Sequence, residues 1–124
     1  MQREDVRAEL KGLHSPDVLD LEGFRPQAPF GILIQAMISP AGADGKESFD
    51  FILCTPEWFA NHISSDIATG RHHVFVKRYN FSSLQSFLRN FCASCRGESW
   101  QAVAQKLGRI GKWEFEDYVP WRQR

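Results

Sequence analysis

Two cysteines in the second half of the chain have a spacing that can carry chemistry. Cys92 and Cys95 form a Cys-x-x-Cys pair, the spacing found at structural zinc sites and in thiol redox motifs. Structural zinc normally takes four ligands from two paired motifs, whereas the third cysteine, Cys54, stands alone in an apolar segment. A redox pair opens a helix, where the dipole lowers the thiol pKa, but this pair closes a predicted helix and continues its apolar period. We therefore interpret both thiols as small buried side chains.

The four histidines are the second candidate for chemistry. His72 and His73 are neighbours in a predicted strand, so their side chains point to opposite faces and cannot act as one pair. His62 falls on the apolar stripe of a predicted helix, which is typical of a core or rim histidine. A ribonuclease with two histidines would need a second one brought close by folding, and the pattern leaves that open. No motif of defined mechanism and no phosphate-binding glycine pattern is present, so we predict no enzyme activity, metal or cofactor.

Charge is distributed unevenly along the chain. The 15 Lys and Arg balance the 15 Asp and Glu, but residues 1–70 hold 5 basic and 11 acidic side chains, and residues 71–124 hold 10 basic and 4 acidic. An acidic surface steers a basic partner and speeds association. We predict that the first half of the chain binds such a partner through a set of acidic side chains: Asp44, Glu47, Asp50, Glu57 and Asp66.

The basic second half supports an alternative hypothesis, a nucleic-acid-binding module. Its lysines and arginines are interleaved with aromatic residues, a pattern found in proteins that bind nucleic acids. However, Lys106 and Arg109 lie one turn apart on the predicted helix face opposite the apolar stripe, which is the usual place for solvated charges. The zero net charge also means that any basic patch competes with an equal acidic one. We therefore rank nucleic-acid binding below a protein partner.

Five segments have the pattern of strands. Residues 6–11 alternate between apolar and charged side chains. Residues 32–38 are almost continuously apolar, as in a strand covered on both faces. Residues 49–54 place large apolar side chains on one side, and a glycine-containing loop joins them to the preceding segment as an antiparallel hairpin. Residues 73–79 and the aromatic–acidic tail 113–118 are expected to form further strands.

Three later segments have helix signals. Thr55, followed by proline and glutamate, combines an N-cap hydroxyl with the residues favoured in a first turn. A second helix is expected from Ser82 or Ser83, and a third from Ser99, each with apolar residues at the helical period. Strands followed by clustered helices are typical of α+β proteins. We predict a mostly antiparallel sheet of four to five strands with two to three helices packed on one face.

Length and composition indicate one ordinary folded domain. A chain of 124 residues with 43% hydrophobic residues can build one core, so we expect a single domain over residues 1–124. The charged N-terminus lacks the apolar run of a signal peptide, and the longest apolar stretch is too short to span a bilayer. With three cysteines and no export signal, we expect a cytoplasmic protein without a membrane partner. The oligomeric state is left open.

Several stretches of the chain, which together cover most of residues 8–118, carry a family resemblance. They are AELKGLHSPD (8–17), QAMISPAGADGKESFDFILCTPEW (35–58), RHHVFVKRYN (71–80) and the run from Phe91-Cys92 through SWQAVAQKLGRIGKWEFEDY (99–118). In these stretches the chain resembles the immunity protein 8 family of bacterial polymorphic toxin systems. The most specific piece is the last predicted helix together with the run that follows it, in which Trp113-Glu114-Phe115 matches a family pattern.

This resemblance implies a non-catalytic immunity protein that neutralises a cognate protein toxin by forming a stoichiometric complex with it. Such toxins are often nucleases with basic substrate clefts, which an acidic inhibitor can complement. The resemblance brings no active-site residues with it. We expect Gly111, Trp113 and Phe115, which match the family pattern, to have structural roles.

Overall fold

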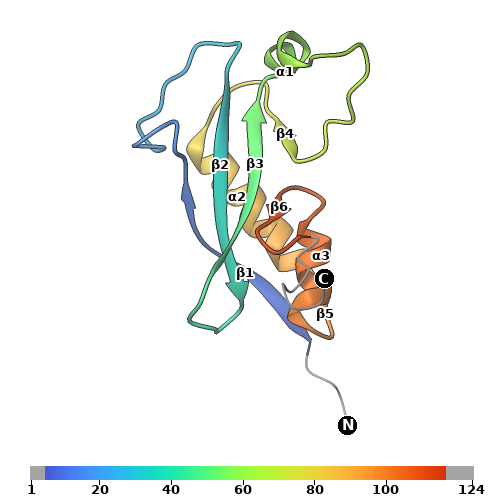
Figure 1. Ribbon diagram of the computed structural model, residues 1–124. Helices are drawn as coiled ribbons and strands as arrows, with labels where there is room; N and C mark the ends of the chain where they lie inside the picture. The colour runs from blue at the N-terminus through green and yellow to red at the C-terminus, as the bar shows by residue number, and fades with distance from the viewer. Residues whose placement is uncertain (1–4, 117–124) are drawn as a thin grey trace.

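The computed structural model describes residues 5–116, which fold into one six-stranded sheet with three helices (Figure 1). The strand order is β4-β3-β2-β1-β5, and β6 also pairs with β3. Because β2 occupies one edge of β3, the strands β4 and β6 share its other edge, β4 beside residues 52–54 and β6 beside residues 49–50. The strands are β1 (Val6–His14), β2 (Gly31–Pro40), β3 (Glu47–Cys54), β4 (His73–Phe75), β5 (Arg96–Gly97) and β6 (Lys112–Trp113).

The α+β class and the β2–β3 hairpin are confirmed, but the sheet is mixed. The first strand pairs antiparallel with β2, and β2 with β3, whereas β4 runs parallel to β3. The chain leaves the end of β3, forms α1 (Pro56–His62), and returns through a loop before it enters β4 in the direction of β3. This crossover makes β4 parallel to β3, and no local pattern in the sequence predicts that direction.

Each helix begins at a polar cap. The Thr55 hydroxyl accepts the Trp58 backbone N–H at the start of α1, and Ser99 caps α3 (Trp100–Leu107) in the same way, as predicted. The second helix, α2 (Phe81–Ser94), begins one to two residues earlier than predicted. Its cap is Asn80, whose side-chain oxygen accepts the Ser83 N–H at 2.8 Å.

The core lies between one face of the sheet and the two later helices. Figure 1 shows α2 and α3 on the same side of the long β2–β3 hairpin. Alternate residues of β2 and β3 point to these helices, and their side chains are at most 7% exposed. Leu88 of α2 and Leu107 of α3 complete this packing and are fully buried. The buried sheet residues are Ile32, Ile34, Ala36, Ile38, Phe49, Phe51 and Leu53.

Four local expectations differ from the structure. The outer face of β2 is half-buried, so the prediction that 32–38 is covered on both faces is wrong. The strand expected at 73–79 ends at Phe75. Of the strand expected at 113–118, Trp113 alone belongs to β6, residues 114–116 form a turn, and the remainder lies outside the described residues. Phe87, on the predicted apolar stripe of α2, is 48% exposed. Each helix within residues 5–116 is too short or too polar to cross a membrane.

Candidate partner-binding surface

The acidic side chains predicted to bind a partner lie at two ends of the molecule. Asp44 is exposed in the loop between β2 and β3, whereas Glu57, at the start of α1, is exposed beyond the far end of β3. The eight residues of β3 span about 26 Å, so these two carboxylates are well separated (Figure 1). Asp66 is exposed in the loop after α1. The structure therefore brings Glu57 and Asp66 into one region and leaves Asp44 at the opposite end.

Glu47 has a structural role that the sequence does not reveal. One of its carboxylate oxygens accepts the indole N–H of Trp100 at 2.9 Å and that of Trp113 at 2.8 Å. Phe49, two residues later on the same face, lies edge-on to Trp100 and is stacked on Trp113. Hydrogen bonds to an ionised acceptor are among the stronger ones in proteins. We call Glu47, Trp100 and Trp113 the indole clamp, because they hold α3 and β6 against β3.

The run at 111–114 is built into the same contact. A Cβ on Gly111 would lie 3.1 Å from a backbone carbon of Phe49, so a larger residue there would require β6 or β3 to shift by a few tenths of an ångström. The Glu114 carboxylate accepts the Ser48 backbone N–H at 2.7 Å. Gly111 and Trp113 thus have the structural roles expected of them, whereas Phe115 is 40% exposed.

Asp50 lies on the outer face of the sheet. It is half-buried and stands in register between Gln35 of β2 and Lys112 of β6. Among the residues that the structure describes, its Oδ1 atom is buried and has no hydrogen-bond partner. Asp50 is therefore less accessible to a partner than Asp44, Glu57 or Asp66.

The three cysteines are buried, as the helical period predicts for Cys92 and Cys95. Desolvation raises the pKa of Cys92 to about 12, and burial also raises the pKa of Cys95 and of Cys54. These thiols therefore stay protonated at neutral pH, which is the unreactive form. Within residues 5–116, no three potential metal-binding side chains come together.

His72 lies apart from His62 and His73, which line the same groove beside α1. His72 lies 3.7 Å from the Glu116 carboxylate, while His73 contacts the ring of Phe59, with ring centroids 4.9 Å apart. The ring of His62 is stacked on Trp58 with centroids 4.0 Å apart. As predicted, His72 and His73 do not act as one pair.

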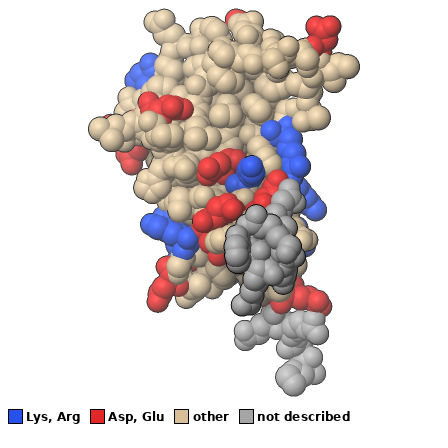
Figure 2. Space-filling view, viewed as in Figure 1, with Lys and Arg blue, Asp and Glu red and all other residues tan. Residues whose placement is uncertain are grey.

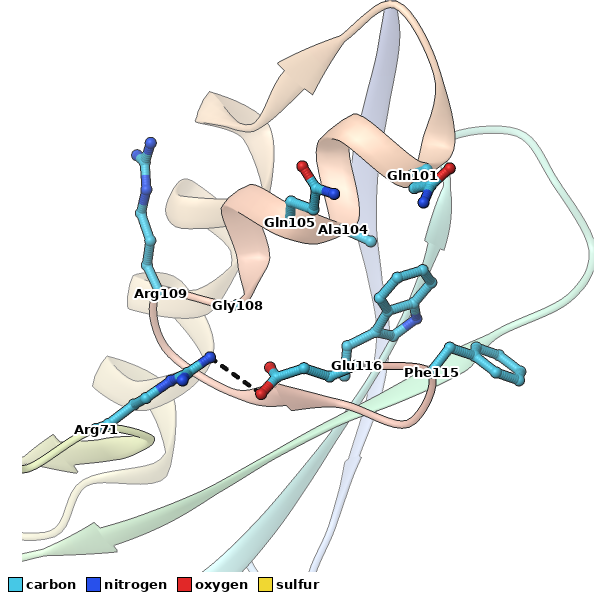
Figure 3. Close-up of a pocket in the computed structure, with 9 residues that line it drawn as sticks. Arg71, Gln101, Ala104, Gln105, Gly108, Arg109, Phe115 and Glu116 are labelled. Carbon is cyan, nitrogen blue, oxygen red and sulfur yellow. Dashed lines mark hydrogen bonds and ion pairs between the residues drawn. The ribbon is translucent and has the colours of Figure 1, made fainter. Parts of the chain in front are cut away.

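Basic side chains of the second half line a groove of about 500 Å³ beside α3 (Figure 3). Arg71 points into this groove and forms an ion pair with Glu116 at 3.0 Å, so its charge is partly compensated. Arg109 extends away from that pair. The described residues end at Glu116, which lines this groove, and we place no partner site in it. On the face shown in Figure 2, charges of both signs are intermixed.

A cluster of aromatic side chains surrounds α1 at the other end of the sheet. The register of β4 against β3 places His73 and Phe75 on one face, where both rings contact Phe59. The exposed fractions of Phe75 and Ile67 are 46% and 85%. A groove of about 370 Å³ runs between α1 and the loop that follows it. We call this set the α1 surface: Trp58, Phe59, His62, Ile67, His73 and Phe75.

The sequence predicts the apolar stripe of α1 but not its exposure. None of the residues of α1 is buried, although the stripe predicts a helix that packs on the core. The seven-residue length of the helix and the polar loop after it are the signals that could have suggested this. In Figure 2, the upper part of the molecule, where Figure 1 places α1, carries few charged residues. The α1 surface is therefore an aromatic, largely uncharged patch.

Comparison with known proteins gives one match. A family model described as Immunity protein 8 matches residues 8–118, which is most of the chain and includes the indole clamp and the α1 surface. Neither a curated protein nor a solved structure matches the chain.

Proposed function

This chain belongs to the Immunity protein 8 family, and from that premise we propose that it binds a cognate bacterial toxin domain and neutralises it by forming a stoichiometric complex. The family match carries the proposal. The structure supports it because the described residues offer accessible binding surfaces, whereas their thiols are buried. In this proposal, the protein acts by binding the toxin domain rather than by catalysing a reaction, and it does so in the cytoplasm.

The exposed acidic residues suggest how it meets a basic toxin. Asp44, Glu57 and Asp66 are exposed, so each can contribute to attraction at a distance. A nuclease toxin, with a cleft shaped for a polyanion, would associate faster with a partner of this kind. Asp50 is less accessible, and Glu47 contributes through the indole clamp to the fold. Of the five acidic residues predicted to bind a partner, three therefore remain as candidates: Asp44, Glu57 and Asp66.

The proposal is tested with the C-terminal domain of the toxin encoded beside this protein's gene. Purified together, the two chains are expected to form a complex of fixed stoichiometry, and co-expression is expected to restore growth of cells that make the toxin domain. Protection that needs far less than one copy per toxin molecule would contradict stoichiometric inhibition. So would the absence of any complex at micromolar concentrations.

A parallel measurement addresses nucleic-acid binding. Contacts to phosphates weaken steeply with salt, so a binder that uses the basic side chains should shift RNA or DNA at low salt. We expect no shift with the pure protein. A salt-dependent shift at micromolar protein concentrations would favour the nucleic-acid hypothesis.

A further inference from the structure

We propose that the α1 surface is the energetic centre of the toxin-binding interface. Its occupant is the toxin domain, which places an apolar or aromatic side chain against Phe59, Ile67 and Phe75. Basic toxin side chains around that anchor face Glu57 and Asp66. This inference rests on the proposed function and adds to it the surface and the chemistry of the partner.

The fold leaves part of the α1 surface exposed. Aromatic residues in the core, such as Phe49 and Phe51, are at most 1% exposed, whereas Phe75 is 46% exposed. Ile67 is 85% exposed, although burying an isoleucine stabilises a protein by about 1.5–3 kcal/mol. Apolar area at these positions therefore remains free to be buried by a partner. Large side chains of this type dominate the binding energy of protein interfaces.

The rings of this surface are already held in place. Phe59 lies edge-on to His73 and to Phe75, with centroids 4.9 and 5.3 Å apart. Trp58 packs so closely on β2 that a Cβ on Gly31 would lie 2.3 Å from its ring. A partner that binds preordered rings loses less side-chain entropy than one that must order them. The arrangement thus favours binding without prior rearrangement.

The charges beside the α1 surface indicate a basic partner. Glu57 precedes Trp58 on α1, and Asp66 precedes Ile67 in the loop, and both acids are exposed. The nearby cation, Arg71, is paired with Glu116. Basic side chains of a partner would therefore meet uncompensated carboxylates at this rim.

Charge also distinguishes this surface from the other exposed aromatic patch. On α2, Phe87 is 48% exposed and its ring is stacked near Phe91. The sequence of α2 contains Arg89 and no acidic residue, so this helix offers no carboxylate to a basic partner. The two patches offer similar apolar exposure beside charged residues of opposite sign, and this contrast provides matched controls.

The experiment compares paired variants for binding to the neighbouring toxin domain, with rates measured at a surface or by stopped flow. Phe75→Ser and Ile67→Ser, alone and combined, change the α1 surface. Phe87→Ser and Leu19→Ser are the controls, because their side chains are 48% and 105% exposed elsewhere. The combined α1 variant is expected to raise the dissociation constant by about 30-fold or more. Either control is expected to change it by less than about threefold.

Charge reversal tests the rim separately. Glu57→Lys with Asp66→Lys is expected to slow association at low salt by about fivefold or more, with a smaller effect at high salt. Asp44→Lys, at the other end of β3, is the matched control and is expected to have the smaller effect. Circular dichroism checks that the Ser and Lys variants are folded. Ile67→Lys serves as a further variant of the α1 surface, and because Ile67 is 85% exposed, this substitution is not expected to disturb folding.

The outcomes separate this inference from the proposed function. If the wild-type protein does not bind the toxin domain, the proposed function fails and the inference fails with it. If the wild-type protein binds but the α1 variants bind equally well, the function stands and the inference is overturned. Loss of binding in Phe87→Ser with unchanged binding in the α1 variants would move the interface to α2 and overturn it as well.

Discussion

The indole clamp and the α1 surface combine the same residue types but use them differently. In the clamp, Glu47 is directed inward and accepts two indole N–H groups. At the α1 surface, Trp58 and Phe59 are half-buried, and Glu57 is exposed. At the clamp, α3 and β6 from later in the chain pack against β3, whereas at α1 the following segment is a polar loop. Aromatic and acidic side chains therefore serve the fold where another element covers them, and remain available to a partner where none does.

The largest expected difference between the two regions concerns their phenylalanines. Phe49→Ala removes a fully buried ring beside the indole clamp, so we expect it to lower the free energy of unfolding by about 4 kcal/mol. Phe75→Ala removes a ring that is 46% exposed, and we expect it to cost less than about 1 kcal/mol. Urea unfolding followed by tryptophan fluorescence measures both. Equal losses would remove the distinction between a structural and an accessible aromatic cluster.

A smaller difference is expected between the acidic residues of the two regions. Glu47→Ala leaves two half-buried indole N–H groups without their acceptor, and we expect it to lower the free energy of unfolding by about 2 kcal/mol. Glu57→Ala affects only an exposed carboxylate in the first turn of α1, where we expect about 0.5 kcal/mol.

Glu47→Gln is the control for this comparison, because its amide oxygen can still accept an indole N–H and should recover part of the loss. Folded Glu47→Ala protein should also bind the toxin domain with wild-type affinity. If Glu47→Ala instead weakened toxin binding without lowering the free energy of unfolding, Glu47 would belong to the partner-binding surface.

The smallest effect is expected in the rates at which the buried thiols react. Cys54 ends β3 opposite Phe75, next to the helix that has no buried residue, whereas Cys92 lies in the core face of α2. Local opening at the α1 end should expose Cys54 without global unfolding. We expect a thiol reagent at pH 8 to modify Cys54 at least about tenfold faster than Cys92.

Mass spectrometry of the peptides from each time point distinguishes the two cysteines. In denaturant the difference should vanish, and bound toxin domain should slow the modification of Cys54 more than that of Cys92. Equal native rates for the two thiols would show that the α1 end opens only when the whole protein unfolds.

Part of the fold could be predicted because its signals are local. The alternation of β3 places Phe49, Phe51 and Leu53 on one face, and all three are buried. Thr55 and Ser99 cap their helices as predicted, since an N-cap contacts a backbone N–H only three residues away. The start of α2 was misplaced because several adjacent residues, Asn80, Ser82 and Ser83, are all good caps.

The candidate site was less predictable than the fold. Sequence reasoning grouped Asp44 with Glu57, although β3 separates them, because an acidic excess counted along the chain says nothing about distance in space. It also placed Glu47 at the surface, since Trp100 and Trp113 lie 53 and 66 residues away. The α1 surface was missed because an apolar helical stripe predicts a contact without stating whether the protein or its partner provides it.

By itself, the sequence determined the class of the fold, the hairpin, the caps of α1 and α3 and the family, because these depend on contacts between near neighbours or on a pattern read directly. Only the tertiary structure decided that β4 and β6 share an edge of β3, that Glu47 closes the indole clamp, and that the α1 surface stays half-exposed. The physical reason is that the burial of a side chain depends on which distant segment of the chain packs against it. The local periodicity of apolar residues does not show which distant segment will pack on them.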